Sequence, residues 1–287
     1  MFKRKSVAGR DFTVAMLPKN RIQVFFDRIK IRWNLLLLIG LIALVFALPL
    51  IVVRLFYLYE TSQIYQQITD LNIEQDEGLA RIIGLSNFIG LVNIPLWVFF
   101  SIGLAGIMRI TKKIIWGEYL SMRHDFLLGI KENGWHFVFA FLVIAVIGFI
   151  GNYYYNRYFF LGHQSAAEGI IRFLPLAVTV TVIIPVFLFF LSMTVIYRDR
   201  FFVKIRSSIK LYLLTFPKTL TALVGCALPF AFLYIESNIF QFIYQFVLII
   251  FFFPLIVNAW FLYSCYVFDK YINKMSFPEI VDKGIWR

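Results

Sequence analysis

The chain has 287 residues, of which 61% are hydrophobic and only 15% are charged. A soluble domain needs about a quarter of its residues charged, so this composition excludes an ordinary soluble protein. The formal net charge of +12 could suggest nucleic acid. However, the cations gather at residues 1–33, 109–136, 198–218 and 269–287, and this alternation with apolar stretches is the pattern of the positive-inside rule. The composition therefore predicts one membrane domain and no nucleic-acid partner.

The first third of the chain contains two predicted membrane spans. Residues 1–19 form a basic, aperiodic arm, and an amphipathic helix follows, with apolar residues at helical spacing. Asn34–Val53 is a 20-residue stretch without a charge, which is long enough to cross a bilayer. We expect residues 57–86 to be a long, acidic external loop. The chain then returns through Phe88–Met108.

The rest of the chain contains four further predicted spans: Phe137–Tyr155, Leu174–Tyr197, Leu220–Ile235 and Phe240–Phe268. A second and a third amphipathic helix precede the third and the fifth span. Residues 269–287 form a polar tail. Because the basic clusters flank alternate ends of the spans, we expect a multi-pass cell-membrane protein with both termini in the cytoplasm.

A repeated pattern organises these elements. Each returning span contains a proline near its centre, at Pro95, Pro185 and Pro254, and each outgoing span follows an amphipathic helix. The sequence therefore predicts an all-α membrane domain over residues 20–268, with six transmembrane helices in three parallel helix-hairpin repeats. A cytoplasmic interfacial amphipathic helix precedes each hairpin. The repeats cover about residues 20–108, 118–197 and 201–268.

The three prolines have a consequence for backbone hydrogen bonding. Each frees the carbonyl four residues earlier, at Leu91, Thr181 and Ile250. In lipid such a carbonyl needs a partner from a neighbouring helix, a hydroxyl or a water. Three kinked helices could surround a cavity, with the candidate lining residues Asn93, Pro95, Pro185, Pro254 and Asn258. The alternative is that the kinks serve packing and that the amides bond between helices.

The sequence offers little for catalysis or for ion-coupled transport. No acidic or basic residue falls in the middle of a predicted span, which counts against a proton- or sodium-coupled carrier. His124, His136 and His163 are scattered along the chain. No metalloprotease, hydrolase or phosphate-loop motif occurs. We therefore predict no catalytic residue, no metal and no cofactor, and expect that the protein is not an enzyme.

Three stretches carry a resemblance to a known family. They are Leu17–Asp27, the G-E-Y…D-F-x-x-G-I-K-E-N run over Gly117–Asn133, and Phe268–Val281. Together they resemble the YesL-like family of uncharacterised bacterial integral membrane proteins, most clearly over about residues 94–150. Genes of that family often neighbour those for carbohydrate ABC transporters. The resemblance implies, by this association, a role near sugar uptake.

These observations favour a non-enzymatic accessory or scaffold membrane protein, associated with bacterial carbohydrate uptake by an ABC transporter. Its expected partners are the lipid bilayer and sugar ABC-transporter subunits. The candidate docking residues lie on the second and third amphipathic helices: Phe126, Lys131, Asn133, Lys204 and Arg206. The alternative is a channel or permease with a pore between the three proline-kinked helices.

Overall fold

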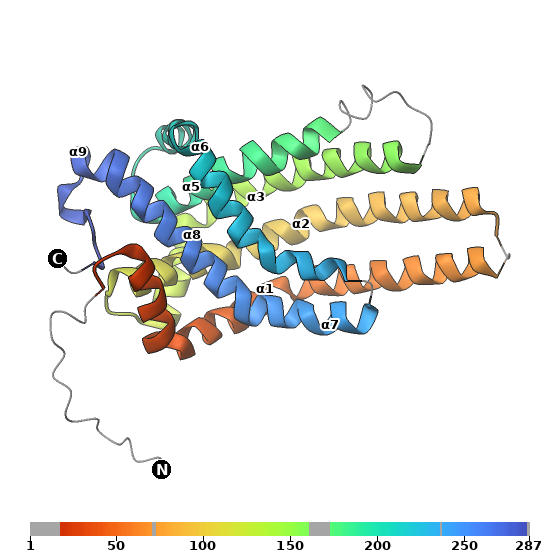
Figure 1. The fold of residues 1–287 in the computed structure, drawn as a ribbon, viewed down its shortest axis with the longest axis horizontal. Helices are drawn as coiled ribbons and strands as arrows, with labels where there is room; N and C mark the ends of the chain where they lie inside the picture. The colour runs from red at the N-terminus through yellow and green to blue at the C-terminus, as the bar shows by residue number, and fades with distance from the viewer. Residues whose placement is uncertain (1–17, 71–72, 161–172, 236, 286–287) are drawn as a thin grey trace, which may run out of the picture.

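The computed structural model describes residues 18–70, 73–160, 173–235 and 237–285. These residues form helices, turns and short connections, with no strand among them (Figure 1). Six helices are long and apolar enough to cross a membrane: Arg21–Thr69, Gln75–Trp116, Met122–Asn156, Phe173–Ile196, Phe201–Ala231 and Ile239–Ser276. The predicted all-α class and the six candidate membrane helices are confirmed, whereas the three-repeat arrangement stays a prediction.

The first helix is longer than a membrane span requires. α1 (Arg21–Thr69) has 49 residues, which corresponds to about 74 Å of helix. The side chain of Asn20 caps its first turn by accepting a hydrogen bond from the Gln23 N–H, 2.8 Å away. Non-helical backbone angles at Arg32 divide α1 in two. The segment before this kink crosses the end of the bundle, and the segment after it runs along the bundle (Figure 1).

The prediction that residues 57–86 form a long external loop is wrong, because most of this stretch is helical. α1 continues to Thr69, and α2 (Gln75–Trp116) starts six residues later, so that most of the supposed loop is an extended helical hairpin (Figure 1). Its sequence is polar enough for a loop, but no glycine or proline occurs between Pro49 and Gly78. Because nothing in this stretch breaks a helix, both helices continue past the apolar spans.

The remaining elements, in chain order, are α3 (Met122–Phe160), η2 (Thr179–Ile183), α5 (Ile184–Ile196), α6 (Phe201–Ala231), η3 (Phe232–Tyr234), α7 (Asn238–Val247), η4 (Leu248–Phe252), α8 (Phe253–Phe268), η5 (Asp269–Asn273), α9 (Lys274–Ser276) and η6 (Pro278–Ile280). Three of them, η2, η4 and η5, are π-helical. α2 and α3 pack along each other, and α8 lies beside α1.

The core of the bundle is apolar and lies between α1, α2, α3, α5 and α8. Its fully buried side chains include Ile39, Ile107, Phe137, Phe190 and Phe261. A second apolar cluster joins α5, α6 and α8. Large apolar side chains also cover the outside of the helices, as at Val45 and Val224. An apolar exterior of this kind suits contact with lipid tails.

Candidate functional site

The three mid-span prolines lie in two different environments. Pro185 and Pro254 are buried, and each is the second residue of the α-helix that follows a five-residue π-helical segment. Pro95 is exposed, and α2 runs through it without such a segment. The three prolines therefore differ in their surroundings. That they line one common cavity stays a prediction.

Two of the proline-freed carbonyls face specific neighbours. The Tyr212 hydroxyl on α6 donates a hydrogen bond to the Thr181 carbonyl. The Ile250 carbonyl lies against Gly40 of α1, where an added Cβ would come within 2.0 Å of the oxygen. At the first site a neighbouring hydroxyl satisfies the freed carbonyl, and at the second a glycine allows two backbones to touch.

The two amides proposed for the cavity also differ. Asn93 is half-buried. Asn258 is fully buried on α8, and neither its side-chain nitrogen nor its oxygen has a hydrogen-bond partner among the described residues. An unpaired buried amide costs about 1–3 kcal/mol. Asn258 is therefore a fully buried cavity candidate whose polar atoms are available to a water or a polar ligand inside the bundle.

Three of the five proposed docking residues lie inside the protein. The ring of Phe126 packs over Gly106 of α2, and its centroid is 6.0 Å from that of Phe46. Asn133 and Lys204 are only 6% and 4% exposed. Asn133 and Lys204 are therefore covered in this fold and Phe126 is half-buried, because the amphipathic segments that carry them form part of the helix packing.

A glycine contact explains why the second amphipathic segment is internal. A Cβ at Gly129 would lie 2.9 Å from the Ala105 carbonyl, so that α2 and α3 approach each other closely at this point. The start of α3 is therefore the end of the α2–α3 hairpin and not a separate interfacial helix. A small-residue contact between helices could have been suspected from the sequence, since Gly103, Gly106 and Gly129 lie in apolar surroundings.

Lys131 and Arg206, the other two docking candidates, are exposed. Large exposed apolar side chains accompany them. Leu127 and Trp135 stand one turn before and one turn after Lys131 and are 54% and 73% exposed, and Phe202 stands one turn before Arg206 and is 81% exposed. We call these five residues the α3–α6 face.

Aromatic contacts hold the two parts of the α3–α6 face together. The Phe201 ring at the start of α6 packs edge-on against Phe139 of α3, with centroids 5.0 Å apart. The His136 ring lies 5.8 Å from Phe201 and 6.0 Å from Phe190. Because His136 and Phe139 are one and four residues after Trp135, these contacts place the start of α6 beside this part of α3.

A chain of buried polar side chains, which we call the polar clasp, joins distant segments at the same end of the bundle. The Arg21 guanidinium of α1 pairs with the Asp269 carboxylate of η5 at 2.5 Å. Asn273 donates to the other carboxylate oxygen at 2.7 Å. The Tyr197 hydroxyl after α5 donates to the Asn273 side-chain oxygen at 2.5 Å. The polar clasp therefore ties α1, α5 and the chain after α8.

The C-terminal tail, expected as a separate polar segment, folds back onto α2. The Lys283 ammonium pairs with Glu118 at 2.7 Å and lies 4.2 Å from the Trp116 ring centroid. Gly284 has a φ of 87° and packs directly on the Ile115 carbonyl, where an added Cβ would be 2.3 Å from the oxygen. The Arg21–Asp269 pair thus joins the first and third of the stretches that carry the family resemblance, and Lys283, two residues after the third stretch, pairs with Glu118 of the second.

A buried carboxylate stabilises the turn between α2 and α3. Asp125 is 2% exposed, pairs with Lys113 at 2.7 Å and accepts a hydrogen bond from the Ser121 N–H at 2.8 Å. Asp125 lies before the apolar span that begins at Phe137. Burial alone would raise its pKa, but the bonds from Lys113 and Ser121 outweigh burial and leave the pKa below its ordinary value.

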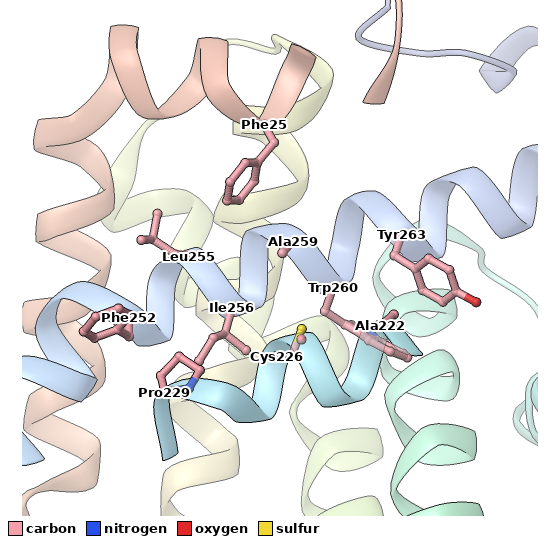
Figure 2. A pocket seen from close by; sticks show the side chains of 11 residues that line it. Phe25, Ala222, Cys226, Pro229, Phe252, Leu255, Ile256, Ala259, Trp260 and Tyr263 are labelled. Carbon is pink, nitrogen blue, oxygen red and sulfur yellow. The ribbon is translucent and has the colours of Figure 1, made fainter. Parts of the chain in front are cut away.

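An apolar groove between α6 and α8 was not foreseen from the sequence (Figure 2). It is open to one side, has a volume of about 340 Å³ and is closed at one edge by Phe25 of α1. The α6 wall consists of small or ring-shaped residues, Ala222, Gly225, Cys226 and Pro229. Their spacing of three and four residues indicates that they share one face of a helix. The sequence does not indicate which helix that face packs beside.

The described residues contain no group of three or more His, Cys, Asp or Glu side chains that could hold a metal ion. No family model, curated protein or solved structure matches the chain. The site must therefore be interpreted from its own geometry.

Proposed function

We propose that this protein is a non-enzymatic accessory or scaffold subunit of a bacterial cell membrane, with its basic end in the cytoplasm. The observation that carries the proposal is the α3–α6 face. It combines a tryptophan, a phenylalanine and a leucine, all more than half exposed, with two cations at the basic end of the bundle. Aromatic and arginine side chains are enriched among the residues that dominate protein–protein binding.

The surroundings of the α3–α6 face support a docking role. Exposed apolar residues elsewhere on the spans have lipid as their natural neighbour, whereas Trp135 and Phe202 accompany Lys131 and Arg206 at the basic end of the bundle. A rigid support reduces the ordering cost of binding. The two cations favour a partner with acidic groups on its cytoplasmic side. The family resemblance makes a sugar ABC-transporter subunit the partner to test first.

The test is affinity purification from the native host in mild detergent at natural expression, with mass spectrometry of stoichiometric partners. We expect sugar-permease subunits in the eluate and their loss from the Lys131→Glu and Arg206→Glu variants. Lys30→Glu, an exposed lysine on α1, is the matched control and should retain them. Lys204 is unsuitable for this test, because reversal of a buried charge would disturb the fold.

Two results would contradict the proposal. A protein that purifies without partners at natural expression would remove the accessory role. Partners that remain bound to both charge-reversal variants would remove the α3–α6 face as their docking site.

A second candidate function, a channel or permease, is favoured by one observation, the buried and unpaired amide of Asn258. A pore beside this amide would give it water or a solute as its partner. Purified protein in liposomes should then conduct a solute, and Asn258→Leu should abolish the flux. Absence of flux from the native protein would leave the scaffold as the better account.

A further inference from the structure

The groove between α6 and α8 is an apolar surface between two membrane helices. Ala222, Cys226 and Pro229 of α6 face Ile256 and Ala259 of α8 across it (Figure 2). An added Cβ at Gly225 would have no other atom within 4 Å, so this wall faces open space. Water does not fill an apolar groove in hydrocarbon, and unfilled walls lose dispersion contacts. The occupant of the groove should therefore be an apolar chain.

The end of the groove toward the basic side is polar. The Tyr263 hydroxyl at this end forms a hydrogen bond of 2.9 Å with the Thr219 hydroxyl. Lys218 stands one turn before Ala222 on the groove side of α6, and Lys270 of η5 stands two turns after Tyr263 of α8. Both lysines are exposed, and neither forms a salt bridge with a described residue. Two hydroxyls thus follow the apolar walls, and beyond them come the Lys218 ammonium and the Lys270 ammonium, which lies 5.1 Å from the Tyr271 ring centroid.

The length of this arrangement matches one leaflet. The twelve residues from Lys218 to Pro229 are separated by eleven helical rises, which correspond to about 16 Å. Half of a hydrocarbon core of about 30 Å is about 15 Å. An amphiphile with one chain along α6 would therefore place its headgroup at the depth of Lys218, and Lys270 would lie two helical turns farther toward the basic end.

We propose that the α6–α8 groove binds one acyl chain of an anionic phospholipid from the leaflet at the basic end, with its phosphate held by Lys218 and Lys270. Charge complementarity selects the headgroup, because ammonium groups near a membrane surface attract anionic lipid. The apolar walls select a chain and not a polar solute. This site is independent of the α3–α6 face and of the scaffold function.

The test is native mass spectrometry of the purified full-length protein in mild detergent, titrated with phosphatidylglycerol or with phosphatidylcholine of the same chains. We expect the anionic lipid to bind more tightly than the zwitterionic one. Lys218→Gln and Lys270→Gln should each reduce this preference roughly fivefold. Arg123→Gln, at an exposed arginine on α3, should leave the preference unchanged. Equal binding of both lipids by the native protein would overturn the headgroup assignment.

Gly225→Leu tests the chain site, because its side chain would occupy the groove without meeting a neighbour. We expect roughly tenfold weaker binding of both lipids, since the lost contact with about two methylene groups is enough for that factor. Gly148→Leu on α3, where an added Cβ also meets nothing within 4 Å, is the matched control. Unchanged binding by Gly225→Leu would overturn the groove as the chain site.

Cys226 provides a readout that needs no substitution. Its side chain lines the groove and is half-buried, whereas Cys265 is buried in the core. Phosphatidylglycerol should slow the alkylation of Cys226 by N-ethylmaleimide in the native protein, and free inorganic phosphate should not. Protection by phosphate alone would assign the lysines to a soluble anion, and no protection by lipid would leave the groove without an acyl chain.

Discussion

The two ends of the bundle are constructed differently. At the basic end, polar side chains join segments that are far apart in sequence, as in the Arg21–Asp269 pair and the Lys283–Glu118 pair. At the other end, α1 and α2 extend as a hairpin (Figure 1). Its charged residues are exposed apart from the half-buried Glu60, and the Arg81–Glu77 pair lies within a single helix turn. A long-range polar contact there is the bond from Asn156 of α3 to Ser86 of α2, at 2.8 Å.

This difference indicates where the protein requires a fixed shape. A surface pair in one helix orders only its own turn, whereas a buried pair between distant segments holds their relative positions. The α3–α6 face lies at the fixed end. If the face is a docking site, its geometry depends on the polar clasp and not on the outer hairpin.

The largest effect is expected from Asp269→Ala. This change leaves the Arg21 guanidinium, 11% exposed, without its carboxylate and removes a hydrogen-bond acceptor from Asn273. Loss of one partner of a buried pair should reduce the free energy of unfolding by about 3 kcal/mol. Thermal unfolding in mild detergent measures the loss. Asp76→Ala, the same change at an exposed residue of the outer hairpin, is the control. Equal stability of the two variants would contradict the contrast between the ends.

A smaller, pH-dependent effect is expected from Asp125→Asn. The amide loses the ion pair with Lys113, which should cost about 1.5 kcal/mol at pH 7. Because the pKa of Asp125 is lowered in the folded protein, its contribution is fully present above the ordinary carboxyl pKa of about 3.9 and fades as the pH falls through the lowered value. Thermal unfolding at pH 7 and pH 3 should show the gap to the native protein narrowing in acid. A gap that widens in acid would contradict the assignment.

The smallest effect is expected from Arg81→Ala in the outer hairpin. Its pair with Glu77 spans one turn, and both side chains are about half exposed. Such pairs contribute about 0.5 kcal/mol or less, and the contribution is screened by salt. The thermal midpoint should stay within error of the native value in 0.5 M salt. A loss comparable to that of Asp269→Ala would show that the outer hairpin is as strongly constrained as the polar clasp.

The sequence predicted well what depends on local composition. The apolar spans and the all-α class follow from hydropathy and length. The sequence also predicted that the Thr181 carbonyl has a hydrogen-bond donor as its partner, because a freed carbonyl in lipid needs one. The Tyr212 hydroxyl is that donor. By contrast, the polarity of residues 57–86 predicts a loop where the structure has a helical hairpin, because the stretch between Pro49 and Gly78 contains no helix breaker.

The candidate sites depended on contacts between distant segments, which periodicity cannot supply. Phe126 and Lys204 lie on amphipathic helices, but the fold turns them inward, and the glycines that allow this matter only once α2 and α3 are paired. The polar clasp joins Arg21 to a residue 248 positions later. The groove likewise needs α6 beside α8.

The most direct test of the docking account is photo-crosslinking in native membranes. A photoreactive residue would replace Lys131 of the α3–α6 face or Gln63, an exposed residue of the outer hairpin. The account predicts one discrete adduct with a membrane-protein partner from position 131 and none from position 63. An adduct from position 63 alone, or no adduct from position 131, would contradict a docking role for the basic end.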